Sequence, residues 1–65
     1  MTRQEYKNAL AQKLAFYGFT LNPLTNDMIS ILWHDKISLD SAYGVACDVN
    51  AGFTFAESLD ANANA

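Results

Sequence analysis

Apolar residues recur along the chain at helical spacing, with polar residues between them. In residues 3–17 the apolar positions form one stripe, and the same spacing returns in residues 23–34 and 39–50. Because an α-helix has about 3.6 residues per turn, this spacing predicts three amphipathic helices that each turn one face to a shared core. The expected core residues are Tyr6, Ala9, Leu10, Leu14, Tyr17, Leu24, Met28, Ile31, Leu32, Leu39, Ala42, Tyr43, Ala46 and Val49.

The starts of these helices carry capping residues. Thr2 and Glu5 form a capping box, in which each side chain accepts a hydrogen bond from the other residue's amide. Asn22 followed by Pro23 predicts the start of the second helix, because Asn caps well and Pro at the first helical position loses no hydrogen bond. Further starts are predicted at Ser38 and at Thr54 with Glu57.

Gly18 predicts a left-handed end to the first helix, with Phe19 folding back onto Leu14 in a Schellman motif. Residues 61–65 have nothing to bury and are expected to be a frayed tail. No segment alternates with the period of a strand. The sequence therefore predicts an all-α fold, one small domain over residues 1–60. Its three main helices and short fourth helix are expected at about 3–17, 23–34, 39–50 and 55–60.

Gly44 lies outside the apolar stripe of the third helix, where it weakens the helix by about 1 kcal/mol relative to Ala. Its position permits close contact with another backbone. Lone helical glycines often have no such role, so we favour simple tolerance of glycine at this position.

The length of 65 residues leaves room for one domain, and a chain this short buries only about 60% of its unfolded surface. Small domains often gain stability from disulfides, metals or a partner subunit. Cys47 is the one cysteine, so an intrachain disulfide is excluded, and no Cys/His cluster offers a metal site. We expect no cofactor and no metal, and either very good helix packing or a partner chain.

The apolar runs are a few residues long, far shorter than the roughly 20 residues that a membrane-spanning helix needs. Residues 1–17 carry polar groups throughout and lack the apolar segment of a signal peptide. A lone thiol also fits a reducing environment. We expect a cytoplasmic protein with no membrane contact.

The net charge of −3 is distributed unevenly along the chain. Residues 1–19 carry +2, from three basic residues against Glu5, whereas residues 20–65 carry −5, from six carboxylates against Lys36. An acidic body repels phosphate, which argues against nucleic acid as the main partner. Two nucleic-acid-related alternatives stay open: weak DNA contact through the basic first helix, and acidic mimicry of DNA against a DNA-binding protein. The carboxylates available for mimicry are Asp27, Asp35, Asp40 and Asp48.

Three residue types of a hydrolase triad, Asp27, Ser30 and His34, lie on one helical face. A row along one helix does not converge on a substrate carbon beside an oxyanion hole, so we expect no catalytic residue and no enzyme. Residues 48–52 begin like a calcium-binding EF-hand loop, but Phe53 and Leu59 stand where the loop needs its Gly and its bidentate Glu. No calcium site is expected.

Large apolar side chains exceed what the three stripes need, since the chain holds four Phe, three Tyr and one Trp. Trp and Tyr are enriched at binding hot spots. We therefore expect a small acidic protein-binding module, an adaptor, regulator or inhibitor of a larger protein or a homodimer, of a kind that suits a phage or mobile element. Burial of the aromatic residues in one core is the alternative. The expected partner-binding residues are Ile29, Trp33, Phe53 and Phe55, with Asp35, Asp40 and Asp48 steering a basic partner.

Overall fold

The computed structural model describes residues 1–63 and contains four helices: α1 (Arg3–Phe16), α2 (Asn26–His34), α3 (Leu39–Asn50) and α4 (Phe55–Ala63). Within these residues there is no strand, which confirms the predicted all-α fold.

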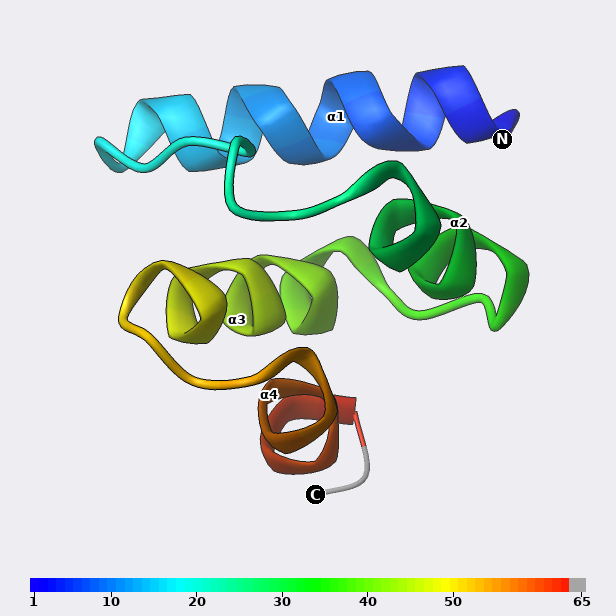
Figure 1. Cartoon of the computed structure of the whole chain (residues 1–65). Helices are drawn as coiled ribbons and strands as arrows, with labels where there is room; N and C mark the ends of the chain where they lie inside the picture. Colours follow the sequence, from blue (N-terminus) through cyan, green and yellow to red (C-terminus); the bar gives the residue numbers. More distant parts are fainter. Residues whose placement is uncertain (64–65) are drawn as a thin grey trace.

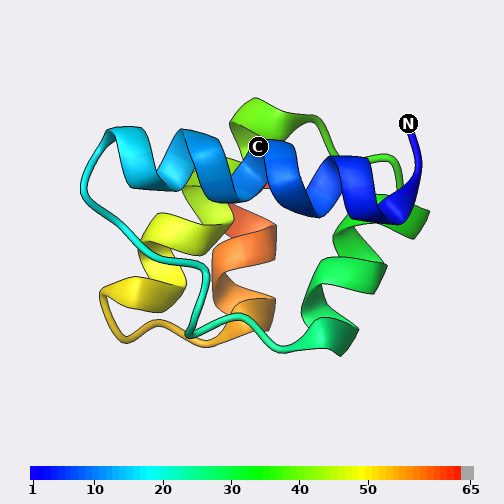
Figure 2. The same cartoon turned by 90° about the horizontal axis from the view of Figure 1, so that it is seen from above.

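α3 lies at the centre of the molecule (Figure 1). α1 crosses above α3, and α4 packs against the opposite side. α2 lies beside α3, under the N-terminal half of α1 (Figure 2). α1 spans the molecule, so its two ends lie at opposite sides of a globule that measures 25 × 25 × 19 Å.

The core forms where α1, α2 and α3 meet. α3 contributes small side chains to this core: Ala42, Val45 and Ala46, which have no exposed surface. Small residues on a central helix let neighbouring helices approach closely, and the larger side chains of α1 and α2 fill the space between them. The other buried apolar residues are Tyr6, Leu10, Leu14, Leu24, Ile29 and Leu32.

The core is complete within one chain. The accessible surface of 4053 Å² agrees with the value of about 4,100 Å² that surface scaling gives for a folded monomer of this mass. No buried side-chain nitrogen or oxygen lacks a hydrogen-bond partner within the described residues. The buried Ser58 hydroxyl, for example, donates to the carbonyl oxygen of Thr54 at 2.8 Å. Within the described residues, the surface area and the buried hydrogen bonds are those of a chain that packs on its own.

The start of α2 differs from the sequence-based expectation. The helix begins at Asn26 with Thr25 as N-cap, and the Thr25 hydroxyl accepts a hydrogen bond from the Met28 amide at 3.2 Å. The prediction of a start at Asn22 and Pro23 was wrong. A tight turn, closed by a 2.9 Å hydrogen bond from the Leu24 amide to the Leu21 carbonyl, occupies that segment instead and carries Leu24 into the core.

Three helices end in the same way. The Schellman motif predicted for α1 is present, because the Phe19 amide donates to the Leu14 carbonyl at 2.8 Å and Gly18 has a φ of +81°. α3 ends with the same pair of hydrogen bonds around Gly52, and α2 ends with them around Lys36. Lys36 has a φ of +57° and is the only non-glycine residue in the left-handed region among residues 1–63.

α4 is longer than expected, because residues 61–63, predicted as part of a frayed tail, belong to the helix; residues 64 and 65 of that tail lie outside the described residues. The Asn62 side-chain amide donates to the Asp48 carboxylate at 2.9 Å and to the Ser58 carbonyl at 2.8 Å. The bond to Asp48 ties the last turn of α4 to α3, and the bond to Ser58 lies within α4. With nine residues, α4 is as long as α2.

Gly44 provides the space for this contact. A Cβ atom at residue 44 would lie 2.8 Å from Cγ of Asn62, closer than two non-bonded carbon atoms approach. Simple tolerance of glycine was therefore the wrong interpretation. The close approach is by the Asn62 side chain, not by a backbone.

We predict that Gly44→Ala has opposite effects in two backgrounds. In the wild-type chain it displaces Asn62 from its two hydrogen bonds, and this loss of about 2 kcal/mol exceeds the helix-propensity gain of about 1 kcal/mol. In an Asn62→Ala background the same change should raise the free energy of unfolding by up to about 1 kcal/mol. Urea denaturation of the four proteins gives the coupling energy. Equal effects in both backgrounds would contradict the contact.

We predict that Lys36→Gly raises the free energy of unfolding by about 0.5–1 kcal/mol, because glycine adopts the left-handed conformation without the steric cost that Lys36 bears. Gly18→Ala is the matched reverse change, since no atom lies within 4 Å of an added Cβ there. It should lower stability by about 1 kcal/mol, through backbone conformation alone. Urea unfolding measures both. A destabilised Lys36→Gly protein would contradict the assigned strain.

Candidate functional site

Four aromatic side chains gather at the end of the molecule where α1 terminates, on the left in Figure 1. We call Phe16, Tyr17, Phe19 and Tyr43 the aromatic cluster. Phe16 and Tyr17 meet edge to face with ring centroids 5.0 Å apart, and Tyr43 of α3 lies 5.2 Å from Tyr17 and 6.4 Å from Phe19. Phe16 is 82% exposed, Tyr17 56% and Phe19 40%. Three of these rings therefore present large apolar faces to solvent.

The turn after α1 explains how the aromatic cluster forms. Gly18 reverses the chain, and Phe19 returns beside the last turn of α1. Tyr17 was predicted to lie in the core and does not, because it is the C-cap residue, whose φ of −100° takes it out of the helical stripe. Tyr43, also predicted for the core, packs only partly against it. The signal for this cluster is the run of Phe and Tyr around a helix-ending glycine.

Lys13 borders the aromatic cluster and forms an ion pair there. Its ammonium lies 2.7 Å from the Asp40 carboxylate and 5.5 Å from the centroid of the Tyr43 ring. The hydrogen bond from Lys13 and the charge of its ammonium lower the pKa of the Asp40 carboxyl. The same bond raises the pKa of Lys13, so both groups stay ionised at neutral pH. Asp40, expected to steer a basic partner, is therefore partly neutralised within the chain.

The Tyr43 hydroxyl stays protonated over the whole physiological range. A hydrogen bond with the Cys47 thiol, one turn further along α3, is the largest of the causes that raise the pKa of Tyr43 to about 12. Tyr43 thus contributes a neutral ring to the aromatic cluster, beside one ion pair.

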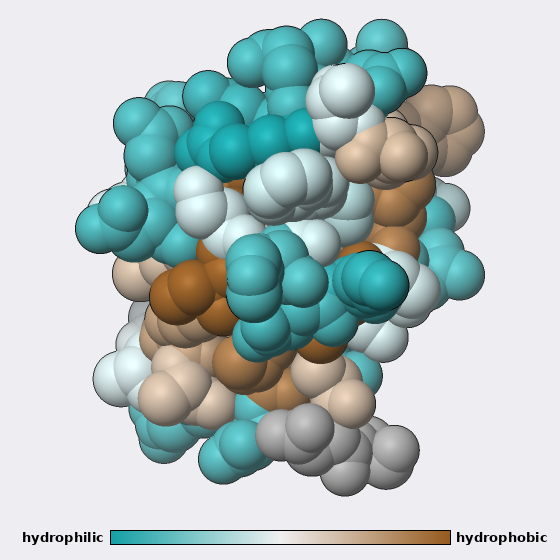
Figure 3. All heavy atoms as spheres, turned by 90° about the vertical axis from the view of Figure 1, so that its right-hand side faces the viewer, coloured by the Kyte–Doolittle hydropathy of each residue, from teal (hydrophilic) through white to brown (hydrophobic). Residues whose placement is uncertain are grey.

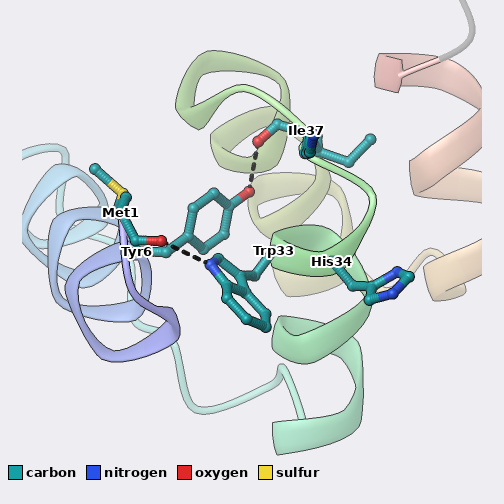
Figure 4. A pocket seen from close by; sticks show the side chains of 6 residues that line it. Met1, Tyr6, Trp33, His34 and Ile37 are labelled. Atoms are coloured by element: carbon teal, nitrogen blue, oxygen red, sulfur yellow. Dashed lines mark hydrogen bonds between the residues drawn. The ribbon is translucent and has the colours of Figure 1, made fainter.

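A second surface feature lies on the opposite side of the molecule, around Trp33. An open hollow of about 590 Å³ is lined by Met1, Tyr6, Trp33, His34, Lys36 and Ile37, and we call it the Trp33 hollow. The indole nitrogen of Trp33 donates to the Met1 carbonyl at 3.0 Å, and the Tyr6 hydroxyl donates to the Ile37 carbonyl at 2.8 Å (Figure 4). These bonds hold α2 and the following turn against α1. His34 points away from Trp33.

Trp33 stands between two hollows. A smaller one, of about 420 Å³, lies on its other flank beside Ser30, Ile31 and Asp35. On this side of the molecule, hydrophobic residues alternate with hydrophilic ones and form no single continuous apolar surface (Figure 3). Trp33 itself is 37% exposed.

Ile29 was expected beside Trp33 on a partner-binding flank, but it is 1% exposed and belongs to the core. Ile31, expected in the core, is 42% exposed. The core face of α2 is centred between Ile29 and Leu32. The helix is therefore rotated about its own axis relative to the orientation that the apolar stripe predicts. At about 100° per residue, Ile31 then lies about 130° from that centre and Trp33 about 70°.

The other predicted site residues are dispersed over the surface. Phe53 is 57% exposed after the end of α3, whereas Phe55 packs partly against the core. Asp48 is partly buried and accepts the hydrogen bond from Asn62, and Asp35 is exposed with its carboxylate 3.3 Å from His34 Nδ1. The structure does not bring these residues together with Trp33 in one surface, apart from Asp35.

The residue types of a hydrolase triad are engaged elsewhere. Ser30 Oγ accepts a hydrogen bond from Arg3 Nε at 2.7 Å, and the His34 ring lies beside Asp35. Among residues 1–63, no three His, Cys, Asp or Glu side chains are placed to hold a metal ion. None of the helices in that range has the length and apolar character needed to cross a membrane.

No protein-family model matches the chain, and comparisons with curated proteins and with solved structures found no significant similarity.

Proposed function

We propose that this chain is a small helical bundle that binds another protein, and that the aromatic cluster is the contact surface. The observation that carries the proposal is the exposure of Phe16, Tyr17 and Phe19 in a chain whose core is already complete. Aromatic side chains dominate the energetics of protein interfaces and are concentrated at hot spots.

The area of the aromatic cluster supports an anchor within a larger contact. Aromatic side chains bury about 150–250 Å² each, so the exposed fractions of the three rings leave about 350 Å² in water. A stable interface buries about 800 Å² per partner. The three rings would supply a little under half of that area, and the neighbouring polar residues would form the rim.

The charges near the aromatic cluster determine the net charge of this surface. Lys13 and Asp40 form one ion pair there, so the cluster presents little net charge to a partner. Acidic DNA mimicry finds less support, because Asp40 is paired with Lys13 and Asp48 is bonded to Asn62. Within the proposal, the lone half-buried Cys47 fits a reducing, cytoplasmic setting.

The test compares Phe16→Ser with Ile31→Ser, two changes at exposed apolar positions on opposite sides of the molecule. Both should leave the free energy of unfolding within about 0.5 kcal/mol of the wild-type value. The immobilised wild-type and Ile31→Ser proteins should retain the same partner, and Phe16→Ser should bind it at least about tenfold more weakly, as loss of a hot-spot ring predicts. Sedimentation of the purified chain shows whether that partner is a second copy.

Equal retention by both variants would contradict the proposal, because the contact would then lie elsewhere. The proposal would also be contradicted if the chain does not self-associate and if no partner binds the wild-type chain more tightly than Phe16→Ser.

A further inference from the structure

The backbone at Lys36 is unusual within this fold. The two other Schellman ends place Gly18 and Gly52 at the left-handed position, where a side chain is unfavourable. Lys36 occupies the same position after α2 with a φ of +57°. A non-glycine residue held in this region is often associated with a functional site.

The Lys36 side chain also differs from the other basic side chains. Lys13 is paired with Asp40, and Arg3 donates to Ser30 and to the Asn26 carbonyl. Among the described residues Lys36 forms no ion pair and no side-chain hydrogen bond, and Lys7, which shares this property, does not line a hollow. Lys36 is therefore a cation at the edge of the Trp33 hollow that has no partner among residues 1–63.

The rest of the Trp33 hollow is mostly apolar. The indole of Trp33 lies beside the ring of Tyr6, whose hydroxyl is bonded to the Ile37 carbonyl (Figure 4). The Trp33 ring is anchored by its bond to the Met1 carbonyl, so its face is held in place rather than free to rotate. An anchored indole face loses little conformational entropy when it is covered.

We propose that the Trp33 hollow binds a segment of a partner protein that carries an apolar side chain next to an acidic one. The apolar side chain covers the indole of Trp33, and the carboxylate accepts a hydrogen bond from the Lys36 ammonium. Charge selects this occupant, because none of the residues that line the hollow is acidic and Lys36, which lines it, forms no ion pair among the described residues. The site lies opposite the aromatic cluster and stands whether or not that surface binds a partner.

A general benefit of a basic residue at a helix C-terminus does not account for this placement by itself. A lysine at a neighbouring position would interact with the α2 dipole as well, without adopting a left-handed backbone. The left-handed conformation ends α2 at a residue that lines the hollow.

Trp33 is the one tryptophan of the chain, so its fluorescence reports directly on the hollow. The probes are three short peptides with acetylated and amidated ends: Ser-Leu-Glu-Ser, its Gln analogue Ser-Leu-Gln-Ser, and Ser-Ser-Glu-Ser. We expect the Leu-Glu peptide to shift Trp33 emission with a millimolar dissociation constant. The Gln analogue should bind about tenfold more weakly, because a charge-assisted bond is lost. The Ser-Glu peptide should bind more weakly too, because it leaves the indole uncovered.

Two variants at residue 36 test the role of its charge at constant backbone strain. Lys36→Gln should bind the Glu and Gln peptides equally, whereas Lys36→Arg should keep the preference for Glu. The proposal is overturned by an unchanged Trp33 emission with every peptide, or by equal binding of the Glu and Gln peptides to the wild-type protein. Tighter binding of octanoate than of the Leu-Glu peptide would overturn the assignment to a protein segment.

Discussion

The close packing of α3 between α1 and α4 is the constraint on which the rest of the structure depends. Towards α1 the helix presents Ala42 and Ala46, which have no exposed surface, and towards α4 it presents Gly44 beneath the side chain of Asn62. Small residues on both faces bring α1 and α4 into contact with one helix of twelve residues. A chain of this length has little surface to bury, so such close packing matters in the absence of a disulfide.

This packing decides which aromatic residues remain outside the core. Aliphatic side chains of α1 and α2 pack against the small residues of α3. Most of the aromatic rings are therefore left outside the core. They are divided between two sides of the molecule. The aromatic cluster lies where α1 ends, and the single tryptophan lies at the opposite side, beside Lys36. A protein with two such surfaces is suited to bridge two partners, or to hold one extended partner.

Much of the fold could be predicted from local sequence signals. The bounds of α3, both capping boxes and the Schellman end of α1 follow from short-range chemistry, and each is present. What could not be predicted depends on tertiary contacts. The rotation of α2, which exchanged Ile29 and Ile31 between core and surface, is set by packing against α1. The last turn of α4 depends on a hydrogen bond from Asn62 to Asp48, fourteen residues earlier, which no local pattern indicates.

The candidate surfaces were partly visible in the sequence, since an excess of aromatic residues indicated binding, but their positions required the fold. Under the proposed function, one chain completes its own core and leaves its aromatic residues for a partner. The most direct test is the urea midpoint of unfolding, measured over a wide range of protein concentrations. A midpoint independent of concentration is the result that a self-sufficient monomer gives. A midpoint that rises with concentration in both the wild-type chain and Phe16→Ser would mean that a second copy completes the fold, which contradicts a self-sufficient core; a rise that Phe16→Ser abolishes would place a second copy at the aromatic cluster.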